Sequence, residues 1–242
     1  MLRHQGQLRH AERACYIKAC SFLHLTVVTG SGYCAAMCSM KTIGLVGGVA
    51  SGKSLVAKML IERGAGVLDA DRAGHAVLAE DVAVQHALRE HWGGAVFNSD
   101  GTVDRKAIAR RVFAAGDVAL AERRFLEKLV HPRIRDRLKM ELARLASDRY
   151  QVVVLDAALL FEADWATLCD LVVFVESPHE TRLKRALTRG WTEAEFTSRE
   201  AAQWPVNDKR LAADIVIANN GTEAELRAAV SDFWRQNVAP IV

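Results

Sequence analysis

A glycine-rich segment constrains the fold of this 242-residue chain more than any other feature of its sequence. Residues 47–54 read GGVASGKS and match the pattern GxxxxGK[ST]. The apolar run KTIGLV comes directly before the segment and predicts a buried strand, and residues 53–63 carry the apolar spacing of a helix that stops at Gly64. A strand, a glycine-rich loop and a helix in this order predict an α/β fold with a phosphate-binding loop.

The chemistry of such a loop explains its spacing. Successive backbone N–H groups turn inward around phosphate oxygens, and the following helix adds the positive end of its dipole. Lys53 is expected to reach the β- and γ-phosphates and Ser54 to coordinate Mg²⁺. The alternative, a glycine-rich turn with a surface lysine, is disfavoured by the flanking strand and helix. We therefore predict ATP and Mg²⁺ as cofactors, with nucleotide contacts from Gly48, Val49, Ala50, Ser51, Gly52, Lys53, Ser54 and Leu55.

Further apolar runs predict the rest of the sheet. They lie at residues 66–68, 151–156, 170–177 and 214–220, and helical patterns separate them. Strands that alternate with helices favour a mainly parallel sheet covered on both faces. Between the second and third strands, apolar stripes such as Ile108 with Val112 predict an inserted helical subdomain. The fold class is therefore α/β of the P-loop NTP hydrolase type, with a five-stranded, mainly parallel sheet flanked by helices and an insert at about residues 72–150.

The charge distribution disfavours nucleic acid as a partner. The formal net charge of +3 arises in residues 1–39, which carry Arg3, Arg9, Arg13 and Lys18 against Glu12. Basic and acidic residues are therefore equal in number over the rest of the chain. A protein that binds phosphate backbones normally has a basic excess on its folded part.

The cysteines and the hydropathy bear on location. Only Cys169 lies beyond residue 39, and the chain has no CxxC pair, so a disulfide framework or zinc site in the main body is disfavoured and a reducing compartment favoured. No apolar run approaches the roughly 20 residues that span a bilayer. We expect a cytoplasmic protein with no membrane association and no obligate protein partner.

Residues 1–39 do not conform to the rest of the chain. Their basic start and apolar run imitate a poor signal peptide, and their scarcity of acids imitates a transit sequence. Because Met40 begins the strand that leads into the phosphate loop, we expect an extension, disordered or due to an upstream start codon, ahead of a kinase domain at residues 40–242.

The acceptor of the phosphate is indicated by carboxylates after the strands. Asp69 and Asp71 follow the second strand, and ligands of open α/β sheets bind beyond the carboxyl ends of strands. A carboxylate there can accept the proton of an acceptor hydroxyl, although Asp69 can equally cap the next helix. Asp156 ends the third strand and is a candidate metal ligand or a structural hydrogen-bond acceptor. A GTPase is disfavoured because no NKxD motif occurs, residues 207–209 having the wrong order.

Several segments occur together in one order along residues 40 to about 236: VGGVASGKS, VLDAD, DGTVDRKAIARRVF, LVHPRI, ALLFE and ADIVIANNG. In this combination the chain resembles the dephospho-CoA kinase family. The resemblance implies ATP-dependent phosphorylation of the ribose 3′-hydroxyl of dephospho-CoA, giving coenzyme A and ADP in the final step of coenzyme A synthesis. The small-molecule partner is then dephospho-CoA.

The resemblance also implies roles for individual residues. Asp71 is expected to be the catalytic base, and the insert to be the substrate subdomain, with Arg105 and His131 as contacts and His131-Pro132 opening a helix. A lid is expected at about residues 185–210, where Arg185 and Arg189 share a helix face and can approach charge on the transferred group. We interpret Arg182 as part of a solvated basic helix, and we expect Asn219 near the nucleotide base.

The chain departs from the family pattern at three positions. Ala50 replaces a usual glycine, which would strain the loop if its φ were positive. Leu55 replaces a threonine and removes a hydroxyl from the α-phosphate. Ala158 stands where a proline commonly precedes LLFE, which affects the positioning of Asp156 and Glu162.

Two other classes of protein share parts of this pattern. A nucleoside monophosphate or shikimate-type kinase would have the same sheet and loop with a different acceptor pocket. A nucleotide-dependent regulator would keep the loop without transferring phosphate, but Asp71 beside Lys53 and Ser54 argues against it.

Overall fold

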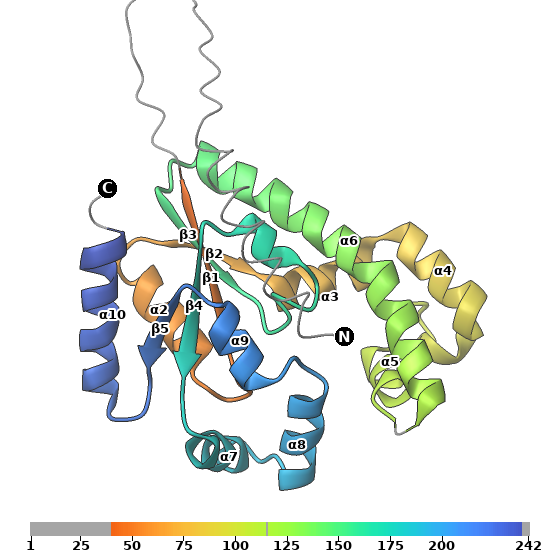
Figure 1. Cartoon of the computed structure of the whole chain (residues 1–242). Coiled ribbons are helices and arrows are strands. Elements are labelled where there is room, and N and C mark those ends of the chain that lie inside the picture. Colours follow the sequence, from red (N-terminus) through yellow and green to blue (C-terminus); the bar gives the residue numbers. More distant parts are fainter. Residues whose placement is uncertain (1–39, 115, 239–242) are drawn as a thin grey trace, which may run out of the picture. The chain divides into compact units, whose positions relative to one another are not determined.

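The computed structural model describes residues 40–114 and 116–238, and the extension predicted at residues 1–39 lies outside them. A single sheet has the strand order β2-β3-β1-β4-β5, and every neighbouring pair is parallel (Figure 1). The predicted fold class is confirmed. The strands are β1 (Lys41–Gly47), β2 (Gly66–Asp69), β3 (Val152–Asp156), β4 (Leu171–Glu176) and β5 (Ile215–Ala218).

Helices cover both faces of the sheet, as the continuous burial of β1, β3 and β4 requires. In β3, Val154 faces the side covered by α2 (Lys53–Ile61) and α10 (Glu223–Asn237), whereas Val153 faces the side covered by the insert. Two apolar cores result, one on each face. Figure 1 shows α2 and α10 together on one side of the sheet and the long helix α6 on the other.

The segment between β2 and β3 is helical, and α3 packs along α6. Asp69, Asp81 and Asp104 each begin a helix by accepting backbone N–H groups at its first turn. In Figure 1, α4 and α5 lie farther from the sheet than α3. The elements are α3 (Ala70–Glu80), α4 (Val82–Trp92), a 3₁₀ turn η1 (Gly93–Val96), α5 (Arg105–Val112) and α6 (Asp117–Ser147).

The prediction that His131-Pro132 opens a helix is wrong, because both residues lie inside α6. Proline removes one backbone N–H from the helix. The Leu129 carbonyl in the same turn accepts a hydrogen bond of 3.0 Å from Nη1 of Arg133. The buried stripe of α6, which includes Ile134, holds the helix continuous through the proline. Tertiary packing therefore outweighs the local preference of proline for a helix start.

Three short helices connect β4 to β5: α7 (His179–Thr188), α8 (Glu193–Ala201) and α9 (Val206–Ala212). Figure 1 shows α7 and α8 beyond the carboxyl end of β4. Another 3₁₀ turn, η2 (Trp165–Leu168), precedes β4. None of the helices within residues 40–114 and 116–238 has the length and apolar character needed to cross a membrane.

Candidate active site

The glycine-rich loop joins β1 to α2 in a tightly packed backbone. Gly52 has φ 98°, and a Cβ atom at this residue would lie 2.2 Å from Nδ2 of Asn219. A Cβ atom at Gly48 would lie 2.6 Å from Nη1 of Arg182. Larger residues at these two positions would therefore displace the side chains that hold the loop from outside.

Side chains from α7 and the end of β5 bind carbonyl groups of the loop. The Val49 carbonyl accepts a 3.3 Å bond from Arg182, and the Ser51 carbonyl accepts bonds of 2.7 Å from Asn219 and 3.2 Å from Arg185. A trans peptide places its C=O and N–H groups on opposite sides. The N–H groups that follow Val49 and Ser51 therefore face away from these partners, as a phosphate cradle requires.

Ala50 adopts φ 57°, in the left-handed region. From the sequence, an alanine at this usual glycine position is expected to strain the loop if its φ is positive, and the structure has this positive φ. The cost of this conformation for a residue with a Cβ atom is about 1–2 kcal/mol. The loop therefore carries local strain that its surroundings offset.

Four of the predicted site residues, Lys53, Ser54, Asp71 and Asp156, form one charged cluster. Ser54 Oγ donates to Oδ2 of Asp156 over 3.2 Å. Burial lowers the pKa of Lys53, and Asp156 and Asp71 oppose that shift. Burial also raises the pKa of Asp156, although Lys53 and the hydrogen bond from Ser54 counteract it. The carboxyl ends of β2 and β3 are adjacent, with Asp69 paired to Asp156, which explains how these groups meet.

The two aspartates after β2 have different positions. Asp69 is the N-cap of α3, and its Oδ1 accepts a 2.9 Å bond from the backbone N–H of Arg72. Asp71 is exposed in the first turn of α3. The capping alternative therefore holds for Asp69, and Asp71 is left accessible to an acceptor.

The interpretation of Arg182 as a solvated residue is wrong. Its side chain is 5% exposed and pairs with Glu200 of α8. Its Nε donates 3.1 Å to the Ser177 carbonyl, and its guanidinium reaches the phosphate loop. The apolar cluster of Val49, Ala186 and Phe196 lies beside it and docks α7 and α8 on the loop. Helical spacing could not reveal this burial, because it depends on α8 and the loop.

The other predicted residues of this region, Arg185, Arg189 and Asn219, differ in their burial and in their hydrogen-bond partners. Arg185 binds Ser51, Ser177 and the side-chain oxygen of Asn219, the last at 3.2 Å. Burial lowers the pKa of Arg185, and the charge of Arg189 adds to the effect. Arg189 is exposed at the end of α7. The buried amide of Asn219 is engaged by the loop and by Arg185.

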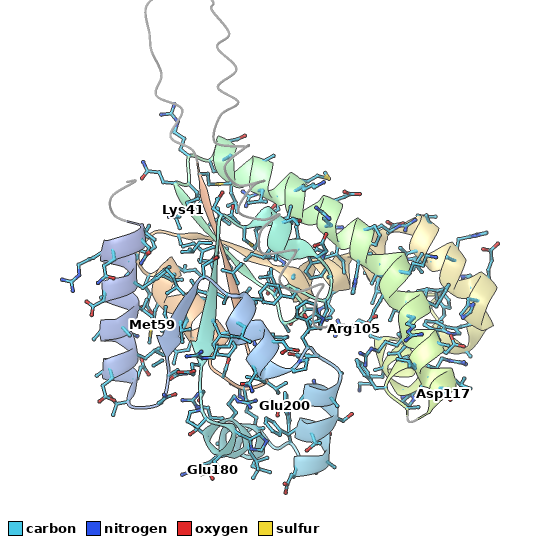
Figure 2. All side chains as sticks on the ribbon, viewed as in Figure 1. Lys41, Met59, Arg105, Asp117, Glu180 and Glu200 are labelled. Carbon is cyan, nitrogen blue, oxygen red and sulfur yellow. The ribbon has the colours of Figure 1, made fainter. Side chains whose placement is uncertain are left out.

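A cavity of about 360 Å³ lies between α3 and the turn that begins α5. Arg105 lines it, and Figure 2 shows this residue on the side of the insert that faces the sheet. Basic and polar side chains line one part of the cavity, and apolar side chains line the rest. Its lining comprises Arg72, His75, Ala76, Leu78, Ala79, Thr102, Val103 and Arg105.

His131 does not line this cavity. Its ring packs edge-on against Trp165, with centroids 5.5 Å apart. Burial lowers the pKa of His131, against the opposing charges of Glu127 and Glu162. His131 therefore lies close to the loop after β3 and outside the lining of the cavity that Arg105 borders.

Sequence reasoning missed Lys209, whose side chain is 1% exposed. Its Nζ lies 2.8 Å from Oε1 of Glu162 and donates to the Ala158 carbonyl and to Gln203, at 2.9 and 3.0 Å. The same oxygen of Glu162 accepts a 2.7 Å bond from the backbone N–H of Trp204. The network ties the loop after β3 to the end of α8. The ALLFE segment gave a signal for Glu162, but no local pattern pointed to Lys209.

The donor set fits Mg²⁺. Across residues 40–114 and 116–238, no group of three or more His, Cys, Asp or Glu side chains forms a complete metal cage. Ser54 and Asp156 nevertheless present two oxygen atoms 3.2 Å apart beside the loop. Mg²⁺ commonly takes one or two protein oxygens and completes its shell with phosphates and water.

Comparison with known proteins gives a consistent result. A family model for dephospho-CoA kinase matches residues 41–225. A dephospho-CoA kinase from Parasynechococcus marenigrum is 44% identical over 192 residues, covering 79% of this chain and 93% of the relative. Another from Geobacter sulfurreducens is 36% identical over 196 residues, covering 81% and 98%.

Solved structures are similar over the same region. A crystal structure of a Thermus thermophilus protein has a TM-score of 0.69 at 32% identity, covering 83% of this chain and 99% of that one. A dephospho-CoA kinase from Campylobacter jejuni has a TM-score of 0.62 over 83% and 98% of the two chains. At 21% identity, the second likeness shows the shared fold.

Proposed function

The chain belongs to the dephospho-CoA kinase family, and from this premise we propose that its site transfers the γ-phosphoryl group of ATP to the ribose 3′-hydroxyl of dephospho-CoA. The products are coenzyme A and ADP. The observation that carries the proposal is the position of Asp71, accessible and within electrostatic reach of Lys53 and Asp156. An acceptor hydroxyl at Asp71 would therefore lie beside the phosphate loop.

On the nucleotide side, the loop N–H groups and Lys53 bind the phosphates of ATP. Ser54 and Asp156 would hold Mg²⁺, which when bound neutralises charge on the phosphate oxygens. Asn219 acts on the nucleotide through the loop, because its amide is bound to Ser51 and Arg185. Leu55 supplies no hydroxyl to the α-phosphate.

In the transfer step, Asp71 accepts the proton of the 3′-hydroxyl while the oxygen attacks the γ-phosphorus. The exposed carboxylate in the first turn of α3 has room for this approach. Arg185 and Arg189 stabilise the charge that develops on the transferred group. Arg189 is free to reach it from the end of α7, and Arg185 lies against the loop itself.

The acceptor lies along α3, with its ribose, diphosphate bridge and pantetheine arm following one another in that order. Beyond Asp71, the helix presents Arg72 and then His75, and Arg105 faces them across the cavity. These residues suit the diphosphate bridge of dephospho-CoA, since guanidinium groups bind phosphate in bidentate fashion. The apolar wall that includes Leu78 suits the pantetheine arm. His131, on α6 beside Trp165, contacts the acceptor from the side of the loop after β3.

The proposal also assigns roles to two larger segments of the chain and a location to the enzyme. The helical insert of about residues 72–150 is the substrate subdomain, and the segment at about residues 185–210 is a lid that excludes water from the transfer step. The distribution of cysteines favours a cytoplasmic enzyme.

In the experiment, purified protein is mixed with ATP and Mg²⁺, and dephospho-CoA, AMP, CMP and shikimate are each added in a separate reaction. The measurement is the release of ADP. We expect strong stimulation by dephospho-CoA and a product phosphorylated at the 3′-hydroxyl. Turnover on another acceptor without stimulation by dephospho-CoA would overturn the assignment.

A further inference from the structure

Arg182 makes contacts that its place on a surface helix does not explain. Its guanidinium is bound by Glu200 of α8 and donates to the carbonyl groups of Ser177 and Val49, at 3.1 and 3.3 Å. It also lies against the backbone of Gly48. Arg182 is thus the link between α8 and the first half of the phosphate loop, 133 residues away from Val49 in sequence.

We propose that Arg182 is a positioning residue of the nucleotide site, which holds the Val49 carbonyl away from the phosphates and thereby sets the affinity for ATP. The inference rests on the proposed ATP site and adds to it the regulation of loop geometry from α7 and α8. Arg182 itself touches the loop and Glu200, and it acts on ATP through the Val49–Ala50 peptide.

The conformation of Ala50 explains what the hydrogen bond from Arg182 to the Val49 carbonyl stabilises. Ala50 is held at φ 57°, which an alanine disfavours. Rotation of the preceding peptide by half a turn would carry the φ of Ala50 to a negative value and relieve the strain of the left-handed conformation. The same rotation would turn the Val49 carbonyl into the cradle and remove the Ala50 N–H from it. The bond from Arg182 to the Val49 carbonyl opposes this rotation.

Glu200 and the apolar residues around Arg182 keep the guanidinium in place. Glu200, labelled in Figure 2, is 20% exposed in its side chain and binds Nη1 of Arg182. Its other carboxylate oxygen lies 3.7 Å from Nε2 of His179. Phe196 is buried, with its ring centroid 5.7 Å from the Arg182 guanidinium carbon. Docking of α8 and the loop conformation are therefore coupled through Arg182, beside the apolar cluster of Val49, Ala186 and Phe196.

The decisive experiment combines Arg182→Met with Ala50→Gly and measures the ATP Kd by calorimetry for each single variant and the double variant. We expect Arg182→Met to weaken ATP binding about tenfold or more, as for a lost hydrogen bond from a charged donor. Its KM for dephospho-CoA at saturating ATP should change less than about twofold, since that contact is not in the acceptor cavity. Ala50→Gly should recover most of the lost affinity in the double variant, because glycine accepts the positive φ without strain.

A purely structural role gives different results. If Arg182 only stabilised the fold, the double variant would keep the weak ATP binding of Arg182→Met, and that outcome would overturn the proposal. Unchanged ATP affinity in a folded Arg182→Met protein would overturn it as well. Lys184→Met is the matched control, since Lys184 is an exposed cation on the same helix as Arg182, and wild-type ATP affinity is expected.

A second pair of variants covers the case in which Arg182→Met does not fold. Glu200→Gln keeps an oxygen that accepts from Arg182 and should preserve ATP affinity, whereas Glu200→Leu removes it and should weaken ATP binding. Equal affinities in the two variants would contradict the proposal. Turnover of dephospho-CoA by the wild-type protein tests the proposed function separately, so failure of one is distinguishable from failure of the other.

Discussion

Ser54 donates a hydrogen bond of 3.2 Å from its hydroxyl to Oδ2 of Asp156, and this contact joins the start of α2 to the end of β3. The two residues are 102 positions apart in sequence. The parallel pairing of β1 with β3 brings them together, because it sets the carboxyl ends of both strands at one edge. The same edge carries Lys53 and Asp71, so the proposed metal, nucleotide and acceptor positions are contiguous.

The affinity for Mg²⁺ should depend on pH through Asp156. Burial raises the pKa of this carboxyl above its ordinary value of 3.8, and only the ionised form binds a cation. As pH falls through the raised pKa, protonation increases and Mg²⁺ affinity is lost, so the loss begins at a higher pH than an ordinary aspartate would show. The measurement is the Mg²⁺ activation constant between about pH 5 and 8. Asp156→Asn should raise that constant and flatten its dependence on pH; a wild-type slope retained in this variant would exclude Asp156 as its origin.

Asp71→Asn should lower kcat on the order of 10²-fold or more, because it removes the proposed general base. The ATP Kd should stay close to that of the wild-type protein. Asp69→Asn is the matched control, since asparagine caps a helix about as well as aspartate and should leave kcat nearly unchanged. A comparable loss of ATP affinity in Asp71→Asn would instead make Asp71 a nucleotide or metal ligand.

Arg105→Gln should raise the KM for dephospho-CoA about tenfold, through loss of a charge-assisted contact with the diphosphate. The KM for ATP should not change, because Arg105 lines the cavity on the insert side. Arg111→Gln provides a control on the same helix, where the exposed residue lies outside the lining of that cavity. Steady-state kinetics with each substrate varied separately measures both KM values. A change confined to the KM for ATP would contradict the proposal that this cavity binds dephospho-CoA.

The sheet and the phosphate loop could be predicted from the sequence because both are encoded locally. Short apolar runs identified all five strands, and the glycine pattern located Lys53 and Ser54. The capping role of Asp69 was one of two alternatives, and the backbone bond from Arg72 decided between them.

The environments of Arg182, Lys209 and Pro132 could not be predicted in this way. Arg182 and Arg185 have the same helical spacing as any solvated basic pair. The loop and α8 together bury Arg182, and the loop binds Arg185. Lys209 finds the Ala158 carbonyl 51 residues away. Pro132 is kept inside α6 by the packing of a helix that continues past it. In each case, long-range contacts override or complete a local pattern.

Ala50→Gly should raise the free energy of unfolding by about 1 kcal/mol, because it removes the strain of a positive φ at a small entropic cost. Urea denaturation measures the change. Ala143→Gly, in the exposed interior of α6, is the matched control and should instead lower stability by about 1 kcal/mol. If both substitutions destabilised the protein alike, Ala50 would not be strained in solution.

Lys209→Met should lower the free energy of unfolding by about 3 kcal/mol, since it leaves the mostly buried carboxylate of Glu162, 15% exposed, without its cation. The loss should be largely local to the loop after β3, where Lys209 also supports the Ala158 carbonyl. Lys184→Met, on the exposed side of α7, should change stability within about 0.5 kcal/mol. Adding Glu162→Gln to Lys209→Met removes the unpaired charge and should recover part of the loss, because a neutral amide costs less to bury than a carboxylate. If the double variant were less stable than Lys209→Met, the unpaired charge would not be the cause, and the remaining hydrogen bond of Glu162 to the Trp204 backbone would account for the difference.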